Sequence, residues 1–411
     1  MMHKYKETKE KIFNAYNKTI SKAKPAKLKE YGLDFVLAGR EGVKVTDTEG
    51  RQYFDCYCSG GQQVLGNYRH EVRDAFREAL KQYDLGNFIL MSAQKAALAK
   101  LLSEVAPGNL KHTVFGVGRG EANDFAMKLA RGATGRKEIV CFAGGSHGQT
   151  GFALSASADP RQEKHFGPLI PGIRRIAPAV DAVEEAVTGS TAAVLVEPIQ
   201  SDAGVVALPS NLLQAIRAAC SRQGAALIVD EGQCAFGRTG LLFECMRHEI
   251  QPDILTVAKG MGGTYYPISA TIFNSRLNRF MLTHTLIHLS TFGGADLGCM
   301  VAIATIEIIR KNRLWDNARV RGAELTKGLQ ELAAADPEQF AAVRGEGLML
   351  GLQLADAAAA ARFTTRLAAK GVIALPTTLN PRVIRFTPPI DITADQTAEL
   401  LDLIAAAMKD Q

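Results

Sequence analysis

The stretch ALIVDEGQCAFGRTG, residues 226–240, decides the fold, because a short apolar run ends there on a carboxylate. The run lacks polar alternation, so it predicts a strand buried on both faces, as in a parallel sheet covered by helices. A second apolar run, PDILTVA at 252–258, ends in the same way on Lys259. Because ligands collect beyond the carboxyl ends of such strands, we expect Asp230 and Lys259 to face one crevice.

Apolar runs and helical patterns alternate on both sides of this stretch. Further strand-like runs lie at 112–116, 138–143, 192–198 and 268–273, and helical spacing occurs at 121–131 and 210–224. This alternation predicts an α/β fold, with a large domain over residues 71–300 whose mostly parallel central sheet is covered by helices.

The two ends of the chain have a different pattern. Residues 39–55 alternate polar and apolar side chains around an Asp-Thr-Glu-Gly turn, which predicts an antiparallel element. The other end begins and finishes with amphipathic helices on either side of VRGEGLMLGLQL, residues 343–354. We therefore expect residues 1–70 and 301–411 to pack together as a small α+β domain.

Composition excludes several functional classes. The 48 basic and 42 acidic residues are scattered, so a net charge of +6 does not indicate a nucleic-acid partner. The 7 cysteines lack metal-site spacing and predict reduced core thiols in a cytoplasmic protein without a metal. No apolar run approaches the roughly 20 residues that span a membrane, and the charged N-terminus does not resemble a signal peptide.

The types of the two strand-end residues point to one cofactor. A buried amine such as Lys259 can form a Schiff base with an aldehyde, and a carboxylate such as Asp230 can keep a pyridine nitrogen protonated. Those are the protein groups that pyridoxal 5′-phosphate (PLP) requires. Considered alone, two such residues would more often form a structural ion pair.

Other segments offer matching binding groups. The loop FGVGRGEAN at 115–123 leads glycines Gly118 and Gly120 into a helix, where free N–H groups suit a phosphate. Thr291, in HLSTFGG at 288–294, offers a hydroxyl as a second phosphate contact. Arg385, between apolar neighbours, suits bidentate capture of a carboxylate, although a structural ion pair would also explain it.

Seven motifs in chain order resemble the class III (ornithine- and ω-type) aminotransferases, PLP enzymes of fold type I. The resemblance runs from about residue 30 to the C-terminus and includes VTDTEGRQYFD, LVEPIQSDAGV, LIVDEGQCAFGRTGLLFEC, PDILTVAKGMGG, STFGGADLG, VRGEGLMLGLQL and IRFTPPIDIT. It implies a PLP-dependent transaminase that moves an amino group between a primary amine or amino acid and a keto acid. The implied mechanism is ping-pong, with 2-oxoglutarate or pyruvate in the carboxylate-bearing couple.

The resemblance also implies roles for the cofactor residues. Lys259 would form the Schiff base and later carry the proton between the substrate carbon and the cofactor. Asp230 would pair with the pyridine nitrogen, and Gln233 would contact the 3′ oxygen of the ring. Thr291 would reach the phosphate of the neighbouring subunit, which implies a homodimer with active sites at the subunit interface.

Two further residues concern the substrate. Arg385 matches the family arginine that grips a substrate carboxylate. Asp202 falls where many relatives have a glutamate that pairs with that arginine. The pairing would neutralise the arginine when a substrate presents an amine end without a carboxylate.

Three departures from the family pattern concern the cofactor pocket. Relatives read S-G-T-E where residues 118–121 read G-R-G-E, so Arg119 adds a cation to the phosphate loop. Ser146 replaces the aromatic residue stacked on the cofactor, and Gly232 replaces the valine behind it, so both ring faces are expected to be under-packed. His147 is interpreted as a structural neighbour of the cofactor.

These departures leave two alternatives to transamination open. One is a PLP-dependent racemase or decarboxylase that acts at Cα on the same scaffold. The other is a non-catalytic protein that retains the fold and binds without turnover.

Overall fold

A seven-stranded sheet forms the centre of the computed structural model, which describes residues 8–86, 88–157 and 159–409. The strand order is β4-β12-β11-β10-β7-β5-β6. The bounds are β4 Leu110–Gly116, β12 Ser269–Asn274, β11 Ile254–Val257, β10 Ala226–Asp230, β7 Thr191–Val196, β5 Glu138–Phe142 and β6 Ile173–Ile176. Strand β12 is antiparallel to both neighbours, and the pairs from β11 to β6 are parallel. The predicted α/β fold with a mostly parallel sheet is confirmed.

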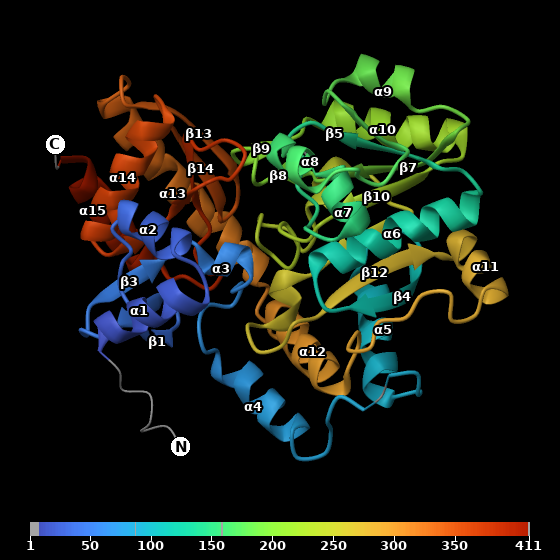
Figure 1. Ribbon diagram of the computed structural model, residues 1–411, viewed down its shortest axis with the longest axis horizontal. Helices are drawn as coiled ribbons and strands as arrows, with labels where there is room; N and C mark the ends of the chain where they lie inside the picture. The colour runs from blue at the N-terminus through green and yellow to red at the C-terminus, as the bar shows by residue number, and fades with distance from the viewer. Residues whose placement is uncertain (1–7, 87, 158, 410–411) are drawn as a thin grey trace.

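Helices cover both faces of this sheet (Figure 1). Successive residues of β10 belong to different core clusters: Ile228 lies in the cluster that contains Leu129 of α6, whereas Leu227 lies in the cluster that contains Ile216 of α10. This explains the unbroken apolar run, because a strand covered on both sides gains no benefit from polar alternation. The helices and short strands of this part are α4 His70–Ala79, α5 Ala93–Val105, α6 Arg119–Thr134, α7 Gly151–Ala156, α8 Pro160–Phe166, α9 Val180–Ala186, β8 Ile199–Gln200, β9 Val206–Ala207, α10 Ser210–Gln223, η2 Glu244–His248, η3 Lys259–Gly262, α11 Ser275–Thr283 and α12 Asp296–Lys311.

The two chain ends share a sheet, and Figure 1 shows their blue and red elements together at the left. Three N-terminal strands join β15, which runs parallel to β3. A second four-stranded sheet has the order β13-β14-β17-β16. The bounds are α1 Lys9–Thr19, α2 Ala23–Glu30, β1 Leu37–Glu41, β2 Lys44–Asp47, β3 Gln52–Asp55, α3 Cys58–Gly61, α13 Leu314–Ala335, β13 Phe340–Glu346, β14 Met349–Leu354, α14 Ala357–Ala369, β15 Val372–Ile373, β16 Leu375–Pro376, β17 Val383–Phe386 and α15 Ala394–Lys409. The domain boundaries at 70/71 and 300/301 stay a prediction, and α12 crosses the second one.

Three further findings bear on the classes that composition addressed. All seven cysteines are buried and unpaired. Along the described ranges, no helix is both long and apolar enough to cross a membrane. The same residues contain no group of three or more His, Cys, Asp or Glu side chains placed to hold a metal ion.

Candidate active site

Asp230 and Lys259 lie at the same edge of the central sheet. Asp230 ends β10, and Lys259 follows the neighbouring strand β11 at the start of η3. Lys259 adopts φ = 49°, a conformation that costs a non-glycine residue about 1–3 kcal/mol and is retained where the surroundings impose it. Its Nζ donates to the carbonyl oxygen of Gly60 at 2.6 Å. No salt bridge joins Asp230 to Lys259 within the described ranges, so the simple ion-pair interpretation does not hold.

The amine of Lys259 is electrically unusual. Burial, together with the positive charges of Arg119 and Arg385, lowers its pKa to about 7. An amine with such a pKa is uncharged in about half of the molecules at pH 7, and the uncharged form can act as a nucleophile.

Asp230 is surrounded by donors. Burial opposes its charge, but Arg119 and His147 together outweigh that effect and hold the pKa of Asp230 below its ordinary value. The carboxylate accepts hydrogen bonds from Arg119 Nε (3.0 Å to each oxygen), His147 Nδ1 (2.9 Å), Asn123 Nδ2 (2.7 Å) and Gly232 N (3.0 Å). His147 is thus a direct partner of Asp230, in keeping with its interpretation as a neighbour of the cofactor site.

The side chain of Arg119 does not stay at the glycine loop where the sequence placed it. It turns inward, so that Nη2 lies 2.8 Å from Asp230 Oδ2 and 2.5 Å from Glu197 Oε1. Glu197 also accepts the N–H of Ser146 at 2.8 Å. A Cβ on Gly232 would lie 2.6 Å from Cδ of Arg119, so only glycine leaves room for this arginine. The expected gap beside Gly232 is therefore filled by Arg119.

The glycine loop presents the N-terminus of α6. Gly118 is its N-cap residue and has an extended backbone, with no side chain to satisfy the first N–H groups. A Cβ on Gly118 would meet nothing within 4 Å, whereas one on Gly120 would lie 2.7 Å from Oγ1 of Thr150. The N–H groups and the dipole of this 16-residue helix suit an anion at this point.

Gln233 and Thr291 have different surroundings. Gln233 is buried, yet its Oε1 has no hydrogen-bond partner in the part of the chain that the structure describes. Such an orphaned acceptor fits a bound group that donates to it. Thr291 lies exposed between α11 and α12.

Arg385 and Asp202 are brought together as the motifs predicted. Arg385 lies on β17, and its Nη1 donates to Ser201 Oγ at 2.5 Å and to Asp202 Oδ1 at 3.2 Å. Its guanidinium carbon lies 6.0 Å from the ring centroid of Tyr57. Burial raises the pKa of Asp202, but Arg385 and then Lys259 outweigh it, and the pKa is lowered. The pair therefore belongs to the same electrostatic neighbourhood as Lys259.

Sequence reasoning missed Asn123 and Glu197. Asn123 links the carboxylate of Asp230 to the carbonyl oxygen of His147, and its Oδ1 accepts from Thr256 at 2.7 Å. Glu197 stood within LVEPIQSDAGV but had no assigned role. Both are buried polar residues. Their burial is the signal that identifies them, and it cannot be read from the sequence.

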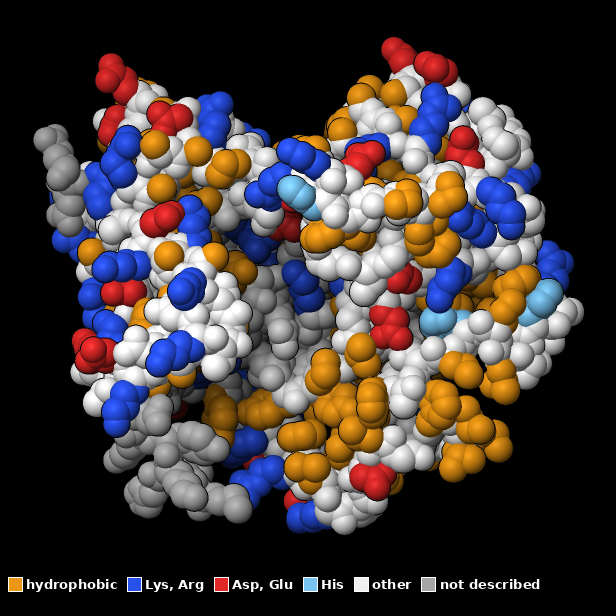
Figure 2. Space-filling view, in the orientation of Figure 1, with side chains coloured by type: hydrophobic (Ala, Val, Ile, Leu, Met, Phe, Trp, Pro, Cys, Tyr) orange, Lys and Arg blue, Asp and Glu red, His pale blue; other side chains and the backbone are white. Residues whose placement is uncertain are grey.

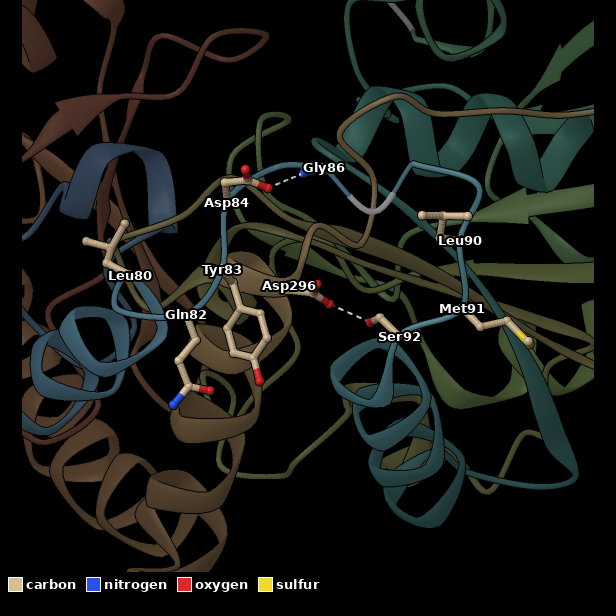
Figure 3. Close-up of a pocket in the computed structure, with 9 residues that line it drawn as sticks. All are labelled: Leu80, Gln82, Tyr83, Asp84, Gly86, Leu90, Met91, Ser92 and Asp296. Atoms are coloured by element: carbon tan, nitrogen blue, oxygen red, sulfur yellow. Dashed lines mark hydrogen bonds between the residues drawn. The ribbon is translucent and has the colours of Figure 1, made fainter.

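Cavity size alone does not find this site. A cavity of about 650 Å³ lies between the end of α4 and α12, lined by Tyr83, Met91 and Asp296 among others (Figure 3). Ser92 donates to Asp296 beside it. A cavity of only about 70 Å³ touches the predicted site, at Ser146 and Asp202. The chemistry of the side chains, rather than the size of the hollow, marks the functional region.

Comparison with known proteins gives a consistent family. The family model for aminotransferase class-III matches residues 29–408. An uncharacterized aminotransferase of Archaeoglobus fulgidus is 39% identical over 403 residues, which cover 98% of this chain and 94% of that protein. A putrescine aminotransferase of Pectobacterium atrosepticum is 34% identical over 365 residues, covering 86% and 78%.

Solved structures share the whole architecture. An ornithine aminotransferase from Toxoplasma gondii superimposes with a TM-score of 0.90 at 25% identity and covers 98% of this chain and 96% of its own. A second structure of that enzyme is described with partial occupancy of PLP at its active site. An (S)-enantioselective ω-transaminase from Thermomicrobium roseum has a TM-score of 0.85 at 31% identity, covering 92% of both chains.

Proposed function

This chain belongs to the class III aminotransferases, PLP-dependent transaminases of fold type I, and we propose that Lys259 and Asp230 are the residues through which it works. The observation that supports this most directly is a buried amine with a pKa of about 7 at the same sheet edge as a buried carboxylate. A structural lysine at a buried position is instead paired with a carboxylate.

The chain offers a place for each part of the cofactor. PLP, when bound, supplies a carbonyl carbon that reacts with amines and a ring that accepts electrons from the substrate carbon. The N-terminus of α6, at Gly118 and Gly120, would hold the phosphate through backbone N–H groups, and Asp230 would hold the ring nitrogen. Gln233, whose buried Oε1 has no partner among the described residues, would contact the hydroxyl at the 3′ position of the ring. Lys259 would hold the cofactor through its amine and would move a proton to and from the substrate carbon.

The substrate couple follows from Arg385 and Asp202. Arg385 grips the carboxylate of a keto acid such as 2-oxoglutarate or pyruvate. When an amine without that carboxylate enters, Asp202 keeps the guanidinium paired, and the 3.2 Å contact supports this use. A relative named for putrescine supports a primary amine as the other substrate. The two half-reactions then follow one another in a ping-pong sequence.

The active unit is a homodimer in the cytoplasm. Thr291 lies among exposed apolar side chains, including Leu286, Ile287, Leu289 and Phe292. Figure 2 shows hydrophobic side chains gathered on the lower part of the face that it draws. A second copy of the chain would cover them and bring Thr291 to its phosphate site. Seven buried free thiols support a reducing compartment.

One half-reaction tests the proposal. An amino donor added alone to the purified protein should convert an absorption band at about 400–430 nm into one near about 330 nm, a property of the cofactor's electronics. Addition of 2-oxoglutarate or pyruvate should restore the first band. Loss of CO₂ from the donor, or loss of its chirality without the change of band, would instead support a racemase or decarboxylase. A protein that binds PLP but changes neither donor nor band would be the non-catalytic relative.

A further inference from the structure

Donors from the described residues already occupy every lone-pair site of the Asp230 carboxylate. Oδ1 accepts from Nε of Arg119 and from the N–H of Gly232, each at 3.0 Å. Oδ2 accepts from Asn123 and His147 and lies 2.8 Å from Nη2 of Arg119. An ionised carboxylate offers about four lone-pair sites, so these donors saturate it. A further N–H can reach Asp230 only where one of them leaves.

Arg119 is the donor that can leave. Asn123 is anchored on the other side by Thr256 and the carbonyl of His147, and Gly232 donates through its backbone. Arg119 is instead a long side chain whose guanidinium has a second buried partner, Glu197, at 2.5 Å. It can release one carboxylate while it keeps the other.

The pocket is shaped to admit this arginine. The missing Cβ of Gly232 leaves the space that Cδ and Nε of Arg119 occupy. The N–H of Ser146 fixes Glu197, which in turn holds the guanidinium. The departures at positions 119 and 232 therefore form one arrangement around a single cation, whose side chain is 9% exposed.

We propose that Arg119 competes with the pyridine nitrogen of the cofactor for Asp230, so that the ring binds only when the guanidinium leaves this carboxylate and stays on Glu197. The inference rests on the proposed function, because it assigns Asp230 to the ring nitrogen. Displacement leaves no buried charge unpaired, since the ring N–H replaces one donor to Asp230 and Glu197 retains Arg119. The affinity for the cofactor is reduced by the fraction of molecules in which Asp230 is already occupied.

The test measures binding without turnover. The probe is 4′-deoxypyridoxine 5′-phosphate, which has the ring nitrogen and the phosphate but no aldehyde to react with Lys259. Its dissociation constant is measured by equilibrium dialysis against the full-length chain after hydroxylamine has removed any bound cofactor. Arg119→Gly should bind the probe at least about tenfold more tightly than the unaltered chain, because Asp230 is then free.

A second variant and a control protect this test. Gly232→Ala keeps every charged side chain but places a methyl group 2.6 Å from Cδ of Arg119, which forces that side chain to move, so it should also tighten binding. This variant decides the matter if Arg119→Gly does not fold. Arg217→Gly removes a guanidinium that pairs with Asp253, 2.8 Å away and just before β11 at the opposite edge of the sheet, and should leave the constant unchanged.

The outcomes separate the two hypotheses. If the unaltered chain binds the probe, and Arg119→Gly and Gly232→Ala bind it equally or more weakly, the competition is overturned. The proposed function then still stands. No binding by the unaltered chain or by either variant overturns both. Tighter binding in the variants, including binding that the unaltered chain lacks, supports the competition.

Discussion

The two edges of the central sheet each hold an aspartate paired with arginine, and their differences separate a site from a structural contact. At the amino edge, where the parallel strands begin, Asp253 accepts from Arg217 at 2.8 Å and from the N–H of Leu227 at 2.9 Å. The Arg217 side chain is 22% exposed. At the carboxyl edge, where the parallel strands end, the side chains of Asp230 and Arg119 are both shielded from water.

The edge at the carboxyl ends of the strands also carries a buried amine that can react. Asp253 is surrounded by arginines, which stay charged at all ordinary pH values, and by backbone N–H donors, which carry no charge. Asp230 shares its edge with Lys259, whose pKa is lowered to about 7. Arginine pairing alone therefore says little about function, whereas a nearby group that changes charge near neutral pH indicates chemistry.

Loss of Lys259 should give the largest effect. Lys259→Ala removes both the group that binds the cofactor carbonyl and the proton carrier, so transamination should fall by at least ~10⁴-fold. Turnover with an amine donor and a keto acid measures the loss, and circular dichroism checks the fold. Lys27→Ala, at an exposed pair with Glu30, is the control and should be fully active. Activity retained in Lys259→Ala would refute the assignment.

The lowered pKa of Lys259 predicts a pH-dependent stability for the cofactor-free chain. Its pKa is about 7 when folded and near the ordinary value when unfolded, so the unfolded state binds more protons between about pH 7 and pH 10. The stability of the unaltered chain should therefore rise with pH across that window, relative to Lys259→Met.

Denaturant titrations at several pH values measure this difference. At pH 7 the Lys259→Met variant should be more stable than the unaltered chain by about 3–5 kcal/mol, and the gap should close near pH 10. A gap that is constant with pH would mean that Lys259 is charged in the folded chain, and the contrast between the two edges would then be weaker than described.

Matched substitutions at the two aspartates test the contrast directly. Asp230→Asn should lower kcat about 10²–10³-fold, because the ring nitrogen loses its counter-charge. Asp253→Asn should leave kcat unchanged and lower the free energy of unfolding by about 1–3 kcal/mol, since it only weakens donors at the amino edge. Steady-state kinetics and urea titration of both variants measure this. A loss of kcat in Asp253→Asn equal to that in Asp230→Asn would remove the distinction.

The sequence predicted those parts of the molecule that depend on local pattern. Unbroken apolar runs identified the strands, and the residues that end them, Asp230 and Lys259, lie at one edge as expected; the family resemblance is confirmed by the match over residues 29–408. The direction of the Arg119 side chain could not be predicted, because it depends on Gly232 and Glu197, which lie far along the chain. The roles of Gln233 and Thr291 rest on groups outside this chain and stay predictions.

The Arg385–Asp202 pair provides the finest test, because it lies between the two kinds of contact. Arg385 is buried like Arg119 at the carboxyl edge, but the side chain of Asp202 is 21% exposed, close to the 22% of Arg217 at the amino edge. Arg385→Ala should therefore weaken the keto-acid half-reaction by about 2 kcal/mol, the low end of the scale for losing a desolvated charged partner.

Asp202→Ala should have the smallest and most selective effect. It leaves Arg385 with Ser201 as its hydroxyl partner and exposes a bare cation to the methylenes of an amine that lacks a carboxylate. The half-reaction of that amine should weaken by about 1 kcal/mol, while the keto-acid half-reaction stays within error, because the substrate carboxylate itself then pairs with Arg385. Single-turnover kinetics of each half-reaction, followed at the two absorption bands, separate these effects. Equal losses in both half-reactions for both variants would place Arg385 and Asp202 with Asp253 as structural residues, because a structural pair cannot distinguish which substrate has entered.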